Sequence, residues 1–413
     1  MRTEIVVGVA AVLATGCQLV FTSSDDAGPV KRDAPATVDA DTTCACSGKD
    51  LTCATGTRRC DFGCISAASA GGGAVCASYQ PSNGADWNDF ASVTAGLTLG
   101  GGQVGTLDLA NSDIVIDGTV VHSGNDVSGG IAVRRVGGNV YVALNSLQIE
   151  TGATFTIKNT AAVPAQPVIF TVRGDAVING TLDVSGLSLG GCGPGRASNS
   201  GFGGGSGGAF GATSGAGGSG DGQSSGITAS VPACGNNVEA GIAIGSGGGG
   251  GAIIGGNGIG GAGGGAVQIS VVGTFSQRGV VVASGRAGTK SADGGNGGGS
   301  GGAILIESAN YLSIGTCGLY ANGGSGSGGN NEEGIDGLRS TMPAKPAGHG
   351  GSGGALQVPA DAGTTTALAV GSGTIYKGGG GGGSVGKIAV RSRNLNSSNM
   401  CTSSPAARII ALP

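Results

Sequence analysis

Short apolar runs alternate with turn residues along most of this chain. From about residue 84 onward, segments such as VGTLDL, TFTIKN and PVIFTV gather Val, Ile, Leu and Thr, and Gly, Asn or Asp residues separate one run from the next. Runs this short and rich in β-branched residues are typical of strands, and no apolar period of 3.6 residues is visible in this region. The pattern predicts an all-β fold.

The strand-like runs belong to an internal repeat. PVIFTVRGDAVINGTLDVSG from Pro167, AVQISVVGTFSQRGVVVASG from Ala266 and AILIESANYLSIGTCGLYANGG from Ala303 align as one unit, and a worn copy, GKIAVRSRNLNSSN, begins at Gly386. A unit of about twenty residues made of short strands is about one turn of a parallel β-helix. We therefore predict a β-solenoid. An antiparallel sandwich is the competing fold, but it favours hairpins and Greek-key spacing over tandem units.

Stacked turns would bury their aliphatic side chains in one continuous column, because a single turn cannot bury them alone. Successive turns lie one strand spacing apart, about 4.8 Å. The inward positions that we predict are Ile169, Val177, Leu182, Val184, Val267, Ile269, Val280, Val282, Ile304, Ile306, Ile314 and Leu319.

Glycine accounts for 93 of the 413 residues and shows no three-residue collagen period. Its longest runs fall between the repeat units, at Leu187–Gly265, Arg286–Gly302 and Gly323–Val385. We interpret these runs as insertions that leave the solenoid at one corner and stack on one face. Two states remain open for them. Glycine loses much entropy on ordering, which favours disorder; packed polyglycine-II strands, bonded to their neighbours, would offset that loss.

The N-terminus has the features of an export signal. Arg2 precedes a short apolar stretch, VVGVAAVLAT, too short to span a bilayer as a helix. LATGC resembles the lipobox of bacterial lipoproteins, which implies a signal peptide at 1–16 and lipidation of Cys17; the alternative is an ordinary secretory signal with an incidental cysteine. With Gln18 next, we expect an outer-membrane lipoprotein, facing the periplasm or the cell surface and bound to the membrane by its lipid. Residues 17–43 are polar and predict a flexible linker.

Cysteine parity agrees with lipidation, because removing Cys17 from the 11 cysteines leaves an even number for pairing in an oxidising compartment. Residues 44–83 would form a disulfide-rich module, since so short a segment cannot bury a sufficient core. Zinc fits poorly, because paired CxxC knuckles and histidines are missing from this module. The remaining segments are solenoid turns at 84–186, a glycine-rich insertion at 187–265, and further turns with insertions at 266–413. The disulfide candidates are Cys44, Cys46, Cys53, Cys60, Cys64, Cys76, Cys192, Cys234, Cys317 and Cys401.

Chemistry-bearing motifs are sparse. Gly348-His349-Gly350 is similar to the GHG motif of polygalacturonase-like glycosidases, but those enzymes also need close carboxylate pairs, which the β-region does not show. His122, at a strand end, is expected to be exposed, and two histidines are too few for a three-histidine metal site. We predict no catalytic residues.

The sequence signals for metal-binding and nucleic-acid-binding sites are equally weak. Asp221 sits one place early for a calcium-binding solenoid repeat, and Glu332, Glu333 and Asp336 form either a weak ion site or a solvated loop tip. A net charge of −4 without a basic stripe argues against nucleic-acid binding. We predict no cofactor and no metal.

Four segments carry a resemblance to a known family. They are RCDFGCISAASAGGGAVCASYQPSNGADWNDF, VINGTLDVSG, GGAGGGAVQISV and GGNGGGSGGAILIES. The chain resembles a family of myxobacterial-type secreted proteins and lipoproteins with a C-x-x-G-C…C module, a P-S-N-G junction and glycine-rich repeats ending in a GGSGGAI-type strand. The resemblance covers most of the chain after Cys44 but implies no known function. The likeness to PGRS-type surface proteins is one of composition.

These observations favour a non-enzymatic surface protein with a structural or adhesive role, acting on envelope polysaccharide or another cell surface. The alternative is a carbohydrate-binding or polysaccharide-cleaving β-helix protein, although a single Trp and few other aromatics disfavour a large sugar groove. A third possibility is a receptor binder like those at phage tips, built on a polyglycine bundle. Hexagonally packed glycine strands would distinguish it.

Overall fold

The computed structural model describes residues 44–47, 49–60, 62, 64–65, 74–77, 79–85, 87, 92–161, 166–187, 193–196, 202–220, 228–231, 238, 242, 260–370, 373–395 and 400–412. The chain divides into two compact units, Met1–Asp39 and Ala40–Pro413, and every described residue belongs to the second. The described residues form an all-β structure without an α-helix, which confirms the predicted class. Cys17, Cys192, Cys234 and Asp221 lie outside the described residues.

The cysteine-rich module is a small unit of short strands. β1 (Ala45–Ser47), β2 (Asp50–Cys53) and β3 (Gly56–Arg59) form an antiparallel sheet, and β4 (Cys64–Ile65) pairs with β5 (Val75–Cys76). Its disulfides are Cys44–Cys53, Cys46–Cys64 and Cys60–Cys76. They surround only a few buried side chains, Leu51 and Ala74 among them. Disulfides thus take the place of a large core in this N-terminal region, as the sequence predicts.

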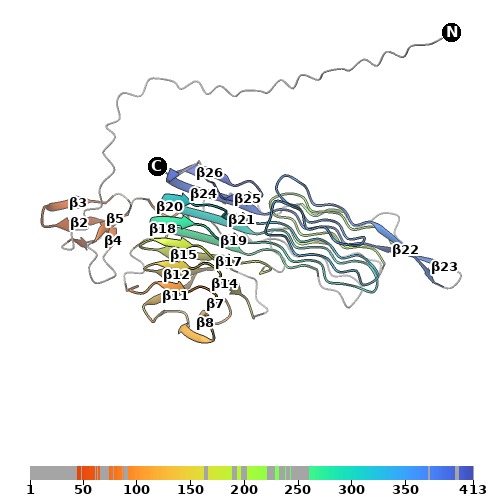
Figure 1. The fold of residues 1–413 in the computed structure, drawn as a ribbon, viewed down its shortest axis with the longest axis horizontal. Coiled ribbons are helices and arrows are strands. Elements are labelled where there is room, and N and C mark those ends of the chain that lie inside the picture. Colours follow the sequence, from red (N-terminus) through yellow and green to blue (C-terminus); the bar gives the residue numbers. More distant parts are fainter. Residues whose placement is uncertain are drawn as a thin grey trace, which may run out of the picture. The chain divides into compact units, whose positions relative to one another are not determined.

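Two larger sheets make up the body of the structure (Figure 1). The described strands of the first are β6 (Leu97–Leu99), β10 (Val127–Ser128), β11 (Ile131–Val136), β12 (Asn139–Leu144), β13 (Leu147–Ile149), β15 (Val168–Val172), β16 (Ala176–Ile178), β18 (Ala266–Gln277), β20 (Ala303–Ser313), β24 (Lys387–Leu395) and β26 (Arg408–Ala411). Those of the second are β7 (Val104–Asp108), β8 (Asp113–Ile116), β9 (Thr119–His122), β14 (Thr154–Lys158), β17 (Thr181–Asp183), β19 (Val280–Val282), β21 (Gly318–Tyr320) and β25 (Thr402–Ser404). A separate hairpin consists of β22 (Thr365–Val370) and β23 (Gly373–Gly378).

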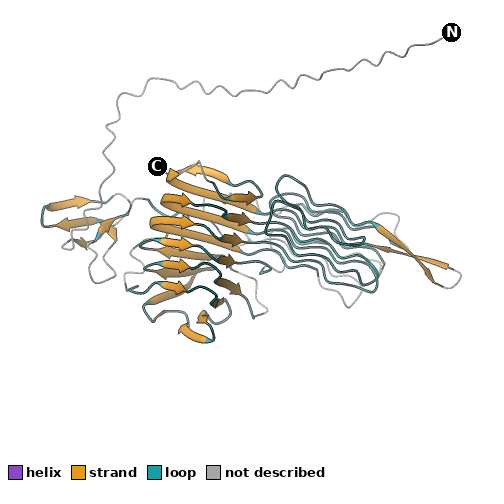
Figure 2. Cartoon of the chain, viewed as in Figure 1, coloured by secondary structure: helices purple, strands orange, loops and turns teal. Residues whose placement is uncertain are grey.

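Both sheets are mixed, with antiparallel and parallel pairs in separate regions. β7–β8–β9 and β10–β11–β12 pair antiparallel. From β12 onward the first sheet runs parallel through β15, β18, β20, β24 and β26. In the second, β14, β17, β19, β21 and β25 are likewise parallel. Figure 2 shows these strands stacked one above another.

The register follows the repeat alignment over the first part of each unit, and a register shift between Val271 and Thr274 then offsets the Ala266 and Ala303 units. Val168 pairs with Val267, Val267 with Ile304, and Ile304 with Ile388. The units that begin at Pro167, Ala266 and Ala303 therefore lie directly on one another, joined through parallel ladders. Each unit passes from the first sheet to the second through a tight turn, such as the one at Asn179-Gly180 between β16 and β17.

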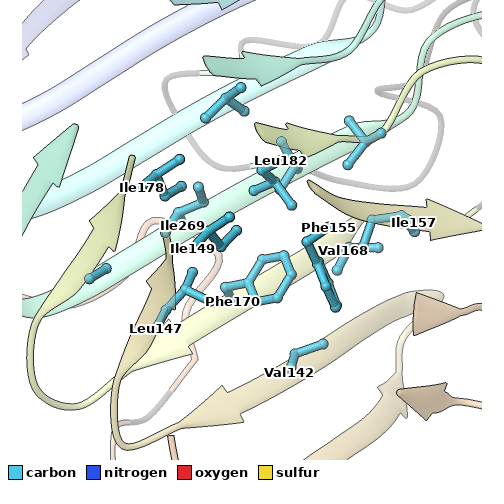
Figure 3. Close-up of a cluster of buried hydrophobic side chains, with 14 of the residues drawn as sticks. Val142, Leu147, Ile149, Phe155, Ile157, Val168, Phe170, Ile178, Leu182 and Ile269 are labelled. Atoms are coloured by element: carbon cyan, nitrogen blue, oxygen red, sulfur yellow. The ribbon is translucent and has the colours of Figure 1, made fainter. Parts of the chain in front are cut away.

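The main core lies between the two sheets and contains residues from every turn of the stack. Figure 3 shows part of it. Among the predicted inward positions, the core contains Leu182, Val184, Val267, Ile269, Ile304, Ile306 and Leu319. It does not contain Ile169, Val177, Val280, Val282 and Ile314. The prediction that these five residues face this core is wrong, although Ile169 and Val282 are buried, with 0% and 1% of their surface exposed.

These errors concern which face of the strand each side chain points to. Successive side chains point to opposite faces, so a shift of one residue moves a position out of the core. Phe170, Ile178 and Val281 occupy the core in place of Ile169, Val177 and Val280. In PVIFTV and GVVVASG both faces carry apolar side chains, and alternation alone cannot fix the phase.

Candidate functional site

Glycine-rich segments form an ordered, buried bundle beside the strands. The described parts lie at 202–220, 260–265, 283–302, 321–354 and 378–386, and most of their glycines are buried. They run between β17 and β18, between β19 and β20, and between β21 and β24, so they connect the same two sheets each time. Figure 2 shows them as long extended loops that run together. For these residues, order rather than disorder is the outcome.

Segment 379–384 shows how the bundle is bonded. The N–H groups of residues 379, 380 and 381 donate to segments 361–364, 324–327 and 205–208 in turn, and residues 382, 383 and 384 repeat this order, at N···O distances of 2.7–3.0 Å. Their carbonyl groups accept from three further segments, 215–218, 351–354 and 298–301, at 2.7–3.0 Å. A repeat of three residues per turn with no side chains between neighbours is the polyglycine-II arrangement. Segment 379–384 thus has six bonded neighbours, as in a hexagonal array.

Close approach of backbones explains why these positions are glycine. A Cβ atom built on Gly380 would lie 2.0 Å from the carbonyl oxygen of Asn296, and one on Gly383 would lie 2.0 Å from that of Gly299. Such distances are far below contact, so any side chain would push the neighbouring backbone away. The bundle therefore requires glycine for packing, and its bonded backbone offsets the entropy lost on ordering.

Two loops with ordinary side chains, 330–349 and 355–363, line the bundle and are fixed to it. Arg339 bonds Asp183 at 2.8 Å, which ties the first loop to the strand stack. The buried Asn322 donates to the carbonyls of Leu338 and Ser340 and accepts from the Ser404 hydroxyl at 2.6 Å. The hairpin β22–β23 projects from the end of the bundle away from the stack (Figure 1).

The acidic residues of loop 330–349 bind different partners. Glu332 contacts His349 Nδ1 at 3.2 Å, Glu333 faces Lys290 at 3.8 Å, and Asp336 bonds Arg286 at 2.6 Å. Within the described residues, no three His, Cys, Asp or Glu side chains gather as metal ligands would. The structure thus separates the three carboxylates considered for an ion site, and it places His349 beside one carboxylate, on the surface.

His122 is buried, so the prediction of an exposed histidine is wrong. It ends β9 as expected, but only 1% of its surface is accessible. Its ring nitrogens Nδ1 and Nε2 lie 3.2 and 2.8 Å from the carbonyl oxygens of Ser128 and Gly124. The following turn folds back over the ring, and these backbone contacts replace the water that an exposed position would offer.

A buried carboxylate on β20 is the feature that sequence reasoning missed. Glu307 is fully buried on the outer face of the first sheet, where Gln268 Nε2 and Ser270 Oγ donate to its Oε2 at 2.8 and 2.9 Å. Arg391, its cross-strand partner on β24, bonds the other oxygen at 2.5 Å. The Ser82 amide, in the P-S-N-G junction, also donates to the carboxylate.

The segment around the P-S-N-G motif, with Tyr79 and Trp87, covers the cluster formed by Glu307, Gln268, Ser270 and Arg391. The Tyr79 hydroxyl lies 2.8 Å from the carbonyl oxygen of Glu307 and 3.0 Å from that of Val271, and the Trp87 indole donates to the Tyr79 carbonyl. Burial raises the pKa of Tyr79 well above its ordinary value, and the negative charge of Glu307 adds to the rise. Every oxygen of Glu307 accepts a hydrogen bond and is buried, so the cluster attaches the segment around the P-S-N-G motif to the first sheet. The only sequence signal for it was the P-S-N-G motif.

A fourth disulfide, Cys317–Cys401, joins the start of β21 to the start of β25. Both cysteines are among the predicted disulfide candidates, and their bond links two neighbouring strands near the C-terminal end of the chain.

No protein-family model matches the sequence, and comparisons with curated proteins and with solved structures give no match. The resemblance to the myxobacterial-type family stays a prediction. None of the described residues belongs to a helix long and apolar enough to cross a membrane.

Proposed function

We propose that this chain is a non-enzymatic lipoprotein of the cell envelope, with a structural or adhesive role. Lipidation at Cys17 would hold it in the outer membrane, and residues 17–43 would separate the folded part from the bilayer. A parallel β-solenoid would serve as the scaffold, and the glycine bundle would serve as the part that meets envelope polysaccharide or another cell surface.

The observation that carries the proposal is the six-neighbour bonding of segment 379–384, which also favours a receptor-binding form of the adhesive role. The bundle is packed mainly backbone to backbone, and segment 379–384 is held by six neighbouring segments at once. It is therefore suited to display loops on a stiff support. The displayed loops include exposed apolar side chains, Leu338, Met342 and Val358 among them.

Parallel pairing supports the solenoid as scaffold. Five consecutive pairings of the first sheet, from β12 to β26, and four of the second, from β14 to β25, are parallel and follow the order of the chain. The core continues from one turn to the next, as the stacking of tandem units requires.

The acidic side chains support binding over cleavage. Hydrolysis of a glycosidic bond uses two carboxyl groups that flank it. Here Glu307 is sealed under the junction, and Glu332, Glu333 and Asp336 are each engaged by a different basic partner. These carboxyl groups do not face one another across an open groove.

The test is display of the full-length protein on a Gram-negative host, with Cys17→Ala as the unanchored control. We expect radiolabelled palmitate to be incorporated only by the parent, and displaying cells to retain envelope polysaccharide or partner cells without releasing oligosaccharides. Met342→Asp and Val358→Asp, on the displayed loops, should weaken retention. Soluble sugar fragments, or retention no greater than that of the host alone, would reject the proposal.

A further inference from the structure

A groove crosses the outer face of the first sheet where β18, β20 and β24 lie side by side. Thr274, Asn310 and Asn394 occupy one row across these strands, because Thr274 pairs with Asn310 and Asn310 with Asn394. The groove above the row is a shallow depression of about 640 Å³ that is largely open to solvent. Its remaining lining residues are Tyr311, Leu312, Arg393 and Leu395.

The row offers neutral hydrogen-bonding groups. Asn394 Nδ2 donates to Asn310 Oδ1 at 2.8 Å, and this bond aligns the two amides across the strands. A primary amide has two donor hydrogens and an acceptor oxygen, so the pair keeps groups of both kinds for a ligand. Sugar hydroxyls also donate and accept. Leu312 adds apolar contact beside the row, which suits the C–H face of a pyranose ring, whereas Leu395 also packs against the main core.

The spacing of the row fits an extended glycan. Neighbouring strands are about 4.8 Å apart. This distance is close to the length of one pyranose residue in an extended chain, so consecutive sugars can each meet the polar group of one strand. Arg393 is the charged side chain of the lining and already has an interaction within the protein. The lining contains no carboxylate and no histidine, and the chemistry it supports is recognition without cleavage.

The floor of the groove is rigid. The rings of Phe275 and Tyr311 stack beneath it with centroids 5.6 Å apart, and both are buried. The Tyr311 hydroxyl bonds Gln277 Oε1 at 2.9 Å and contacts Cys401 Sγ at 3.2 Å, next to the Cys317–Cys401 disulfide. Because the Tyr311 ring faces inward, recognition here would use amides rather than the aromatic stacking that is common in sugar sites.

We infer that this groove binds an extended, neutral glycan across β18, β20 and β24, with Asn310 and Asn394 as its central contacts. The inference rests on the proposed adhesive function and names its ligand class. Binding follows the row across the strands, so affinity should rise with oligosaccharide length until the groove is filled.

The experiment uses the full chain with Cys17→Ala, titrated calorimetrically with neutral β-linked gluco-, manno- and xylo-oligosaccharides of increasing length. The Asn310→Ala/Asn394→Ala double variant should bind roughly tenfold more weakly, since two sets of hydrogen bonds are lost. Asn125→Ala, at an exposed asparagine outside the groove lining, is the matched control and should bind like the parent. Unchanged melting temperatures would show that all three proteins are folded.

Failure of this inference differs from failure of the proposed function. If no neutral oligosaccharide binds the parent, or if the double variant binds as tightly as the parent, the groove is not a glycan site. The adhesive function stands in that case if the double variant, displayed on cells, is still retained by polysaccharide or partner cells. If the displayed parent is not retained either, the adhesive function itself fails.

Discussion

Individual glycines in the bundle are determined by contacts between backbones. At Gly383, the carbonyl oxygen of Gly299 occupies the place where a Cβ would lie. At Gly100, in contrast, a Cβ would meet only the flexible end of the Gln103 side chain, at 3.3 Å. The two glycines look alike in the sequence, but their replacement should have different consequences.

Gly383→Ala should destabilise the protein by roughly 1–3 kcal/mol or more, because overpacking of a tight site forces backbone shifts. Gly100→Ala should stay within about 0.5 kcal/mol of the parent. Urea unfolding curves of the three proteins measure both effects. Equal stability of the two variants would contradict the packing that we describe.

Tyr79 predicts how stability depends on pH at the alkaline end. Its pKa is raised above the ordinary value of 10.0 by burial and by Glu307, so the folded state holds the phenolic proton more tightly than the unfolded state does. The protonated Tyr79 side chain contributes fully to the free energy of unfolding below about pH 10. This contribution is lost as the pH rises toward the pKa of Tyr79 in the folded state, at up to about 1.4 kcal/mol per pH unit.

Tyr79→Phe should therefore flatten the fall in unfolding free energy above about pH 10. It should not abolish that fall, because burial also raises the pKa of Tyr311 and Tyr320. Urea unfolding at a series of pH values tests this, and slopes identical to those of the parent would contradict it.

At the scale of single residues, the sequence could not predict which face of a strand some side chains point to, nor which polar side chains from distant segments meet. Ile169 was assigned inward because PVIFTV is apolar on both faces, whereas register against Gln268 puts it outside the core. Glu307 gave no signal beyond the P-S-N-G motif that contains Ser82, because its partners Ser82 and Arg391 come from segments far away in the sequence. The exposure of His122 could not be judged without the turn that covers it.

Strand elements were more predictable than single side chains. The units starting at Pro167, Ala266 and Ala303 pair in the order that their alignment gives, because tandem copies contain the same strands. Their register agrees with the alignment up to the irregularity between Val271 and Thr274. The hairpin β22–β23 went unnoticed, since it lies inside a glycine-rich insertion and has no counterpart in the other units.

The last turns depend on a covalent link. β25 pairs with β21 over only three residues, next to the Cys317–Cys401 disulfide. Cys317→Ala/Cys401→Ala should lower the unfolding free energy by roughly 4–5 kcal/mol on the chain-entropy model, given a separation of 84 residues. Cys44→Ala/Cys53→Ala, with a separation of 9, should cost less.

Thermal unfolding under non-reducing conditions compares the two double variants with the parent. A larger loss from the Cys44 and Cys53 pair than from the Cys317 and Cys401 pair would contradict the expected order.

For the molecule as a whole, the sequence could locate the glycine insertions but could not decide their state. A run of glycines has no side chains, so it shows no pattern of apolar and polar positions from which its packing partners could be predicted. Order depends on carbonyls supplied by distant segments, as when Gly381 bonds Gly205 and Gly383 bonds Gly324.

Hydrogen exchange followed by mass spectrometry can test that order directly. Amides of residues 379–384, all bonded, should exchange about as slowly as those of β20 and β24. Exposed positions in loop 330–349 provide the fast reference. Exchange of 379–384 within seconds would show that the bundle does not persist in solution.

The threefold bonding of segment 379–384 also constrains how this region can change in length. Each residue faces a neighbour about one third of a rotation away from the one before. Gain or loss of a single codon would therefore turn every later amide toward the wrong partner, whereas gain or loss of three would restore the match. Insertions and deletions that preserve the bundle should accordingly come in multiples of three residues.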